Sequence, residues 1–196
     1  MLKRILIVCI VVLVFVGIIY YSNHTFTSRL NSAIMNSKTD IALTLIEKSN
    51  KDKLNKSNQH YVNYIADSIF NNNSSKGYPI CIASRMGNYK IIKALIDKGV
   101  NLNVKTIGIE DTPLILVLKS DSTDKYKSAN ALIDAGAKIK YSNKEKKTAI
   151  YYAYEQNANI LINDDVIKAR KQCIKKCKEA YGEEDIEKYI KRDYNG

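Results

Sequence analysis

One pattern recurs in the middle of this chain at a spacing of 34 residues, and it limits the possible folds more than any other feature. The first copy, residues 78–103, begins with Tyr-Pro-Ile and contains glycines at Gly87 and Gly99. The second copy begins with Thr-Pro-Leu, so that Pro79 and Pro113 lie 34 positions apart. A unit that returns at a fixed period of this size predicts a solenoid, in which each unit buries its apolar face against its neighbours.

Within each copy the residue types predict two short helices joined by a tight turn. A proline in the first turn suits the start of a helix. Gly87 ends the first helix, and Gly99 ends the second as a left-handed cap. In the second helix the apolar residues recur at helical spacing, and they are Ile91, Ile92, Leu95 and Ile96. The unit is therefore expected to be a pair of antiparallel helices.

The pattern extends in weaker form to both sides of these two copies. Thr148 begins a third copy, 36 positions after Thr112. Upstream of the first copy, apolar residues repeat the interior of the unit, and they are Ala33, Ile34, Ile41, Leu45 and Ile46. We therefore expect a degenerate first repeat at 28–50, full repeats at 76–105 and 108–140, and a degenerate last repeat at 145–163.

Helix pairs with a period of about 33 residues resemble the ankyrin repeat. The residues that carry the resemblance are Tyr78-Pro79-Ile80, Ala83, Gly87, Leu95, Ile96, Gly99, Asn103, Thr112-Pro113-Leu114, Leu132, Ile133, Gly136 and Ala137. The histidine of the family's opening motif is replaced by Cys81, Ile115 and Tyr151, so apolar packing must replace the hydrogen bond that it makes between repeats. The resemblance implies an all-α solenoid of three to four helix-turn-helix repeats over residues 28–165.

Three further segments depart from a regular array. Residues 60–71 have apolar positions at helical spacing and predict an inserted helix, although a lengthened repeat describes them equally well. The second full copy has three extra residues near 120–124, between its helices, where a loop tolerates insertion. Residues 164–196 contain an apolar stripe and predict capping helices that close the array. A docking helix for a partner is the alternative for this last segment.

The N-terminal segment is the most apolar part of the chain. Residues 5–21 form a run of 17 residues without a charge, and Lys3 and Arg4 precede it. A helix of this length spans roughly 25 Å, near the lower limit for crossing a bilayer. We expect residues 1–27 to contain an uncleaved signal anchor, with a cleaved signal peptide or a buried core segment as alternatives. The basic flank then leaves the N-terminus in the cytoplasm and the repeats outside it, in the periplasm if the source is bacterial.

Positive charge is concentrated toward the C-terminus. The chain carries a net charge of +11, and residues 138–178 contain 11 Lys and Arg against four Asp and Glu. Such a surface attracts an acidic protein or an anionic membrane face, and a merely solvated lysine-rich surface is the plain alternative. Because the repeats are expected outside the cytoplasm, we expect no nucleic acid partner.

The sequence offers little material for chemistry. No phosphate-binding loop and no nucleophile elbow can be assembled around the eight glycines. His24 and His60 each stand alone. Cys173 and Cys177 share a helix face, which leaves core packing, a disulfide and a metal site open, although no second pair completes a tetrahedral set. We expect no catalytic residue, no cofactor, no metal and no small-molecule substrate, and hence no enzyme.

The resemblance to ankyrin repeats implies a membrane-tethered module that binds a protein partner, which could be acidic, through a concave face and turn tips. The positions that line this surface in such arrays correspond here to Ser75, Gly77, Arg85, Met86, Gly108, Ile109, Asp111, Lys119, Lys144, Glu145, Lys147, Tyr151 and Glu155. The alternative function is that of an immunity protein, which neutralises a secreted toxin or effector by one-to-one binding outside the cytoplasm.

Overall fold

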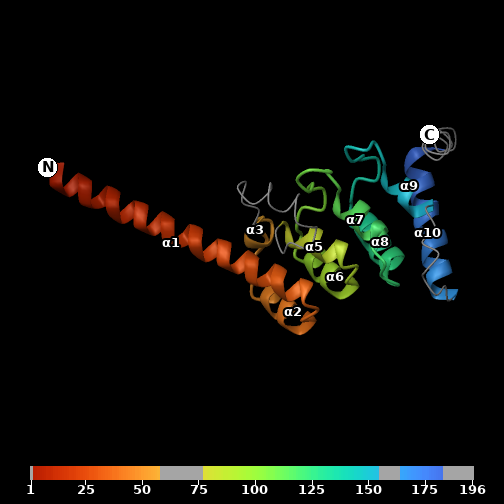
Figure 1. Ribbon diagram of the computed structural model, residues 1–196, viewed down its shortest axis with the longest axis horizontal. Helices are drawn as coiled ribbons and strands as arrows, with labels where there is room; N and C mark the ends of the chain where they lie inside the picture. The colour runs from red at the N-terminus through yellow and green to blue at the C-terminus, as the bar shows by residue number, and fades with distance from the viewer. Residues whose placement is uncertain (1, 58–76, 155–163, 183–196) are drawn as a thin grey trace.

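The computed structural model shows a long N-terminal helix that leads into a stack of shorter helices (Figure 1). It describes residues 2–57, 77–154 and 164–182. The inserted helix predicted at 60–71 therefore lies outside the described residues, as do the end of the last repeat and the final part of the predicted cap. Among the described residues the regular structure consists of helices and an isolated β-bridge between Ser142 and Thr148.

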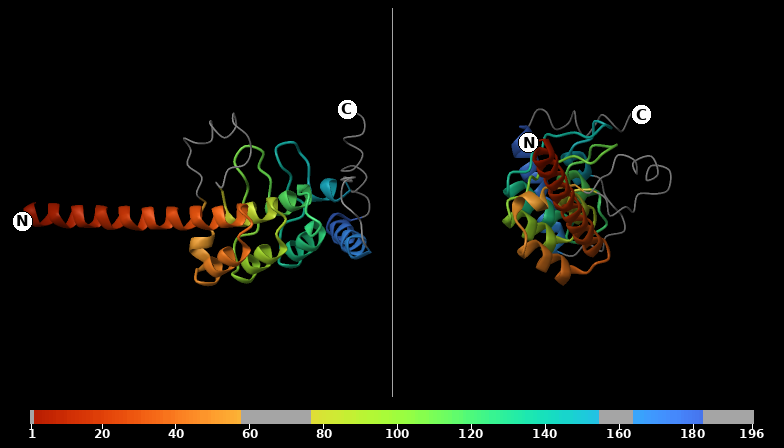
Figure 2. Two further views of the ribbon diagram at one scale, coloured as in Figure 1. Left: turned by 60° about the horizontal axis from the view of Figure 1, so that its bottom comes forward. Right: turned by 90° about the vertical axis from the view of Figure 1, so that its left-hand side faces the viewer.

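The helices stack in two rows, which the left view of Figure 2 shows most clearly. The inner row is formed by α1 (Leu2–Met35), α5 (Pro79–Arg85), α7 (Pro113–Lys119) and α9 (Ala149–Tyr154). The outer row is formed by α2 (Thr39–Glu47), α6 (Tyr89–Asp97), α8 (Lys125–Asp134) and α10 (Asp164–Tyr181), and the short α3 (Lys51–Leu54) lies beside α1. The prediction of an all-helical, ankyrin-like stack is confirmed.

The starts and ends of the helices follow from a few residues. Pro79 and Pro113 each occupy the first turn of an inner helix. The hydroxyl of Thr112 accepts a hydrogen bond from the backbone N–H of Ile115 at 3.3 Å and so caps α7. Gly87 joins α5 to α6 with φ of +61°, a backbone conformation that glycine adopts most readily.

Apolar residues fill the space between the two rows. Cys81 and Ile115, which replace the family's histidine, are 1% and 0% exposed. They lie on the equivalent first turns of α5 and α7, and both pack into the core shared by the rows. Apolar packing therefore does hold these two positions, as the resemblance implied.

The first helix pair is formed by the end of α1 and by α2. Leu30, Ala33 and Ile34 of α1 are buried in the core, whereas Ile41 of α2 is 53% exposed. In the full unit the equivalent residue, Ile91, is buried because α2 packs beside α6. The expectation that Ile41 belongs to the interior is wrong, because no described helix of the outer row covers that side of α2.

The three extra residues of the second unit do not form a free loop. They lie in the segment 120–124, and the hydroxyl of Ser122 donates a hydrogen bond to the carbonyl oxygen of Gly87 at 3.0 Å. A Cβ atom at Gly87 would overlap the Cβ atom of Ser122. The insertion therefore packs against the turn between α5 and α6 of the preceding unit.

The long N-terminal helix corrects the prediction of a membrane anchor. Residues 5–21 are the first half of α1, which continues to Met35 and packs its last turns against α2, α3 and α5. Within the part of the chain that the structure describes, no helix combines the length and the apolar character needed to cross a bilayer. A run of 17 residues gives about 25 Å, against about 30 Å of hydrocarbon. The predicted single-pass location, with a cytoplasmic N-terminus and extracytoplasmic repeats, is therefore wrong, and membrane contact through 5–21 has no support.

Helix α10 closes the far end of the stack and contacts both α8 and α9. Cys173 and Cys177 are free thiols, and both are buried. Their shared hydrogen bond, together with burial, raises the pKa of Cys173 well above its usual value. The amide of Asn130 on α8 donates to the carbonyl oxygen of Ala169 at 2.9 Å, so a polar contact accompanies this apolar packing.

Candidate partner-binding surface

Two loops project from the inner row to the same side of the stack (Figure 2). We call residues 103–111, before α7, the first finger and residues 138–147, before α9, the second finger. The first is closed by a hydrogen bond from the backbone N–H of Thr106 to the carbonyl oxygen of Asp111 at 3.0 Å. The second is closed in the same way between Asn143 and Lys147, also at 3.0 Å. Each finger is therefore a closed turn.

The fingers are bonded to each other and to neighbouring units. The backbone N–H of Lys144 donates to the carbonyl oxygen of Ile109 at 2.9 Å. At the base, the side-chain oxygen of Asn103 accepts from the backbone N–H of Lys138 at 2.8 Å. The two fingers are thus joined at both the tip and the base.

A buried carboxylate holds the first finger to the inner row. Asp111 is 3% exposed, and its Oδ2 atom accepts a hydrogen bond from Nζ of Lys119 on α7 at 2.9 Å. Its Oδ1 atom accepts from Nδ2 of Asn143 in the second finger at 2.8 Å. The same Nδ2 atom lies 3.3 Å from the hydroxyl of Tyr152 on α9. One carboxylate therefore connects both fingers to α7, and through Asn143 to α9.

The pKa of Lys119 reflects these contacts. Burial acts to lower it, but the hydrogen bond and the negative charge of Asp111 outweigh burial and raise it above its usual value. Burial also raises the pKa of Tyr152, whose ring centroid lies 5.3 Å from Nζ of Lys119. At neutral pH Lys119 is therefore an ammonium group beside a neutral phenol.

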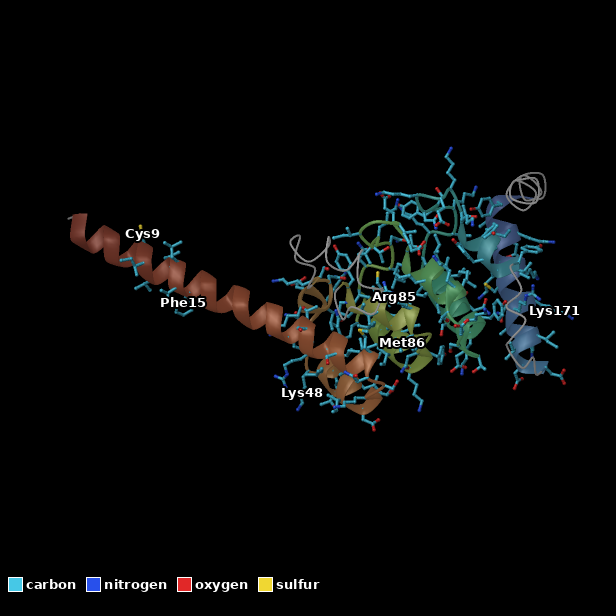
Figure 3. The ribbon with its side chains drawn as sticks, viewed as in Figure 1. Cys9, Phe15, Lys48, Arg85, Met86 and Lys171 are labelled. Atoms are coloured by element: carbon cyan, nitrogen blue, oxygen red, sulfur yellow. The ribbon has the colours of Figure 1, made fainter. Side chains whose placement is uncertain are left out.

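The helices α5 and α7 expose only their C-terminal ends. Every residue of α5 from Pro79 to Ser84 is buried, and so is every residue of α7 from Pro113 to Leu118. Arg85 and Met86, at the end of α5, are exposed and lie below the fingers (Figure 3). The concave face implied by the resemblance is therefore reduced to a rim between the helix ends and the fingers.

Two exposed apolar side chains of the first finger lie at this rim, Ile107 at 45% and Ile109 at 44% exposed. Met86, which follows Arg85 at the end of α5, is 41% exposed. A cavity of about 290 Å³ lies between the first finger and the ends of α5 and α7. Its lining residues are Arg85, Thr106, Ile107, Ile109, Asp111, Leu116, Lys119 and Ser120. The rim therefore combines apolar walls with charged groups.

The second finger presents charges and an aromatic pair. Lys147 lies 3.6 Å from a carboxylate oxygen of Glu145, and Lys144 lies 3.8 Å from one of Glu110. These pairs are largely solvated, so each contributes less than about 1 kcal/mol to stability. Tyr151 meets Tyr152 edge to face, with ring centroids 5.0 Å apart. The finger therefore has a polar surface above an aromatic base.

The structure brings together part of the predicted set. Arg85, Ile109, Asp111 and Lys119 line the same cavity, while Met86 lies next to Arg85 and Gly108 next to Ile109. Lys144, Glu145, Lys147 and Tyr151 belong to the second finger and the helix that follows it. Ser75 and Glu155 lie outside the described residues.

Two predicted residues are buried rather than available for contact. Gly77 is buried, and its carbonyl oxygen accepts a hydrogen bond from the amide of Asn31 at 2.9 Å. Asp111 is buried by the contacts described above. Sequence reasoning missed Ile107, Asn143 and Tyr152. The Ile-Gly-Ile sequence of the first finger could have indicated Ile107. No feature of the neighbouring sequence indicates that Asn143 and Tyr152 contact the Asp111 network.

Comparison with known proteins agrees with the geometry. No curated protein matches the chain in sequence. The family model described as "Ankyrin repeat" matches residues 78–107, which hold α5, α6 and the start of the first finger. Two inner and outer helix pairs, α5–α6 and α7–α8, stack in the same way. Residues 78–107 are therefore similar to an ankyrin repeat, and they lie at the centre of a stack of helix pairs.

Proposed function

We propose that the stack is a protein-binding module whose partner contacts the rim formed by the two fingers and the C-terminal ends of α5 and α7. The ankyrin repeat indicates a module for protein–protein interaction. The observation that carries the proposal is the pair Ile107 and Ile109 of the first finger, which are 45% and 44% exposed on the wall of a cavity that Arg85 and Lys119 also line. Exposed apolar side chains surrounded by polar ones are typical of interaction sites.

The rigidity of the rim supports this assignment. The backbone bond between Lys144 and Ile109 and the side-chain contacts of Asp111 fix the fingers before any partner arrives. A surface that is already ordered loses less conformational entropy on binding. The rim is therefore suited to direct docking.

An acidic protein is the partner that we propose. Five cations lie at or near the rim against the three carboxylates of Glu110, Asp111 and Glu145, and they are Arg85, Lys105, Lys119, Lys144 and Lys147. The surplus of positive charge attracts an acidic surface at long range and so raises encounter rates. The sequence argument against nucleic acid rested on an extracytoplasmic location and has lost that basis. What favours a protein is the apolar part of the rim, which a phosphate backbone would leave uncovered.

The proposed role is binding without catalysis. The two carboxylates of the first finger are engaged by lysines, Asp111 by Lys119 and Glu110 by Lys105 at 3.1 Å. The buried Asp111 therefore supports the frame of the rim, whereas Glu110, whose side chain is 40% exposed, makes a solvated ion pair. The alternative of an immunity protein has no observation in its favour.

Photo-crosslinking in the source cell tests the proposal. A photoreactive phenylalanine is placed at Met86 or Ile109 in the full chain, and at Lys93 or Lys127 on the exposed side of the outer row as matched controls. We expect the two rim positions to capture the same protein and the outer positions not to capture it. Nuclease treatment before analysis separates protein adducts from nucleic acid adducts.

The captured protein is then purified and its affinity for the chain is measured directly. Replacing Ile109 by Asp should weaken this affinity by roughly tenfold or more, because a charge enters an apolar contact. Capture that is equal at the inner and outer positions, or an affinity that Ile109→Asp leaves unchanged, would overturn the proposal.

A further inference from the structure

The first half of α1 carries the longest run of exposed apolar side chains among the described residues. Six consecutive side chains are between 52% and 70% exposed, and they are Ile10, Val11, Val12, Leu13, Val14 and Phe15. Six residues complete more than one turn of a helix, so the exposure includes every side of it. No two of the other exposed large apolar residues in the described ranges are adjacent in sequence, and they are Ile41, Met86, Ile107, Ile109 and Ile167.

The chain's own stack does not cover this segment. The helix α1 contacts the stack through α2, α3 and α5. Its first half projects beyond them, as the left view of Figure 2 and the positions of Cys9 and Phe15 in Figure 3 both show. A contiguous apolar surface of this kind is typical of an interaction site. The molecule that covers it therefore comes from outside the chain.

We propose that the projecting half of α1 packs against the same segment of other copies of this chain, in an antiparallel bundle of four. The apolar run, residues 5–21, contains no charged residue. Each further copy brings a surface of the same length and the same apolar character, so that no charge is buried when the runs align. Most soluble oligomers are built in this way, from identical chains with closed symmetry.

The area of the segment favours four copies over two. A helix with its side chains is about 10 Å wide, so 17 residues have a side surface of roughly 800 Å². A stable interface buries about 800 Å² on each partner. One neighbouring helix covers a stripe of only about 100°. In a four-helix bundle each helix packs against two neighbours and faces the core. Four copies therefore bury a surface that two copies leave largely in water.

Charge and bulk favour the antiparallel direction. Lys3 and Arg4 precede the apolar run, and a parallel bundle would gather these cations of all copies at one end, where they repel. The stack is attached to the last turns of α1, so a parallel bundle would also crowd four stacks at the other end. Antiparallel packing separates neighbouring copies in both respects.

The middle of the run defines the register. With residues 5–21 aligned in opposite directions, Leu13 lies beside Leu13 of a neighbouring copy. Cys9 is exposed and precedes Leu13 by four residues, so the two share one face of the helix. Cys9 is then level with position 17 of the neighbouring copy, about 12 Å along the axis from the Cys9 of that copy. A disulfide requires Cα atoms within about 7 Å, so a thiol at position 13 can cross-link where Cys9 cannot.

Disulfide cross-linking of the full chain tests the direction. The double variant Cys9→Ala/Leu13→Cys moves the exposed thiol by one turn along the same face, and the three buried thiols are unchanged. After mild oxidation with copper phenanthroline, we expect roughly tenfold more cross-linked dimer for this variant than for the parent chain. Equal cross-linking of the two would indicate a parallel bundle or unordered aggregation, and would overturn the proposal.

Sedimentation velocity in detergent-free buffer measures the number of copies. We expect four copies for the parent chain. Leu13→Glu places like charges in the centre of the bundle and should raise the dissociation constant roughly 100-fold or more. Ile41→Glu is the matched control, because Ile41 is 53% exposed at the end of the stack, and it should leave the assembly unchanged. Both variants should keep the cooperative urea unfolding of the stack, which separates an effect on assembly from an effect on folding.

Three results of this measurement would overturn the proposal. They are a monomeric parent chain, a range of sizes without an upper limit, and equal dissociation by Leu13→Glu and Ile41→Glu. A monomer that binds phosphatidylcholine vesicles would assign the apolar run to a lipid surface instead of a second copy. The photo-crosslinking test of the rim uses positions outside α1, so its outcome is independent of these results.

Discussion

The two central helix pairs share a repeat pattern but differ in how their helices are joined. In the first pair, α5 passes to α6 through a tight turn at Gly87. In the second pair, the segment 120–124 separates α7 from α8 and extends back over that turn. From the sequence, the three extra residues are an insertion that a loop tolerates. In the structure they form a contact between the two units. A departure from the repeat period can be the feature that holds two repeats together.

The pairs differ also in what their outer helices bury. The buried residues of α6 are Ile91, Ile92 and Leu95, all of them apolar. The helix α8, which lies between α6 and α10, also buries Lys125, Ser128 and Asn130. The amide of Asn130 donates to the carbonyl oxygen of Ala169, so part of this polar burial serves the contact with α10.

The largest expected effect comes from breaking the contact between the insertion and the turn. Gly87→Ala places a Cβ atom against Ser122 and forces alanine into a left-handed conformation, so we expect a loss of about 3 kcal/mol in the free energy of unfolding. Urea unfolding followed by far-UV circular dichroism measures this loss. Gly99→Ala is the control, since φ there is +67° but nothing lies within 4 Å of the added atom, and it should cost only about 1 kcal/mol. Equal losses in the two variants would show that the insertion does not press on the turn.

The next effect tests the carboxylate that only the second unit possesses. Asp111→Asn removes a charge that Lys119 and Asn143 both contact, and we expect a loss of about 2 kcal/mol in the free energy of unfolding. Glu110→Gln alters an exposed acid in the same finger and should cost less than about 0.5 kcal/mol. If both variants were equally stable, Asp111 would not be the residue that holds the fingers.

A smaller effect depends on pH and separates Cys81 from Ile115, its counterpart in the second unit. Burial raises the pKa of Cys81 from 9.0 to about 12, with Arg85 opposing and Asp111 adding to the shift. Above pH 9 the unfolded chain releases this proton while the folded chain retains it, so stability falls as pH rises. Between pH 8.5 and 10 this loss is about 1 kcal/mol.

Cys81→Val removes the titrating group and keeps an apolar side chain of similar size. We expect the stability of this variant to fall less than that of the parent chain between pH 8.5 and 10, as measured by urea unfolding at each pH. Parallel pH profiles for the two proteins would contradict the assignment of the thiol.

The smallest expected effect concerns the ion pair between the second unit and α10. Nζ of Lys176 lies 2.6 Å from a carboxylate oxygen of Asp134, but the Asp134 side chain is 64% exposed. Lys176→Gln should therefore lower the free energy of unfolding by less than about 0.5 kcal/mol. Asn130→Ala, which removes the buried hydrogen bond to Ala169, should cost more, about 1 kcal/mol. The reverse order would mean that charge rather than burial holds α10 in place.

The helix pairs were predictable because their signals are local. Pro79, Gly87 and Gly99 mark the start, the turn and the end of one unit, and apolar spacing marks its buried faces. The failure at residues 5–21 has a physical reason as well. The apolar run has 17 residues, which give about 25 Å of helix against about 30 Å of hydrocarbon, and it belongs to α1, which continues to Met35 and packs into the stack.

The candidate site was predictable only in part. Arg85, Ile109 and Lys119 follow from their positions within the repeat. The burial of Asp111 does not, because it depends on Asn143, 32 residues away, and on Tyr152 beyond that. Contacts between successive units depend on how the units stack, and the residue spacing within one unit does not predict them.

The backbone hydrogen bond between Lys144 and Ile109 gives the two fingers a property that side-chain contacts would not. Main-chain atoms are present whatever residue occupies the position, apart from proline at the donor. The side chains at the finger tips can therefore be substituted while the main-chain hydrogen bond that joins the fingers is kept. Substitutions at the finger tips can therefore change which partner is bound without changing the fold of the fingers.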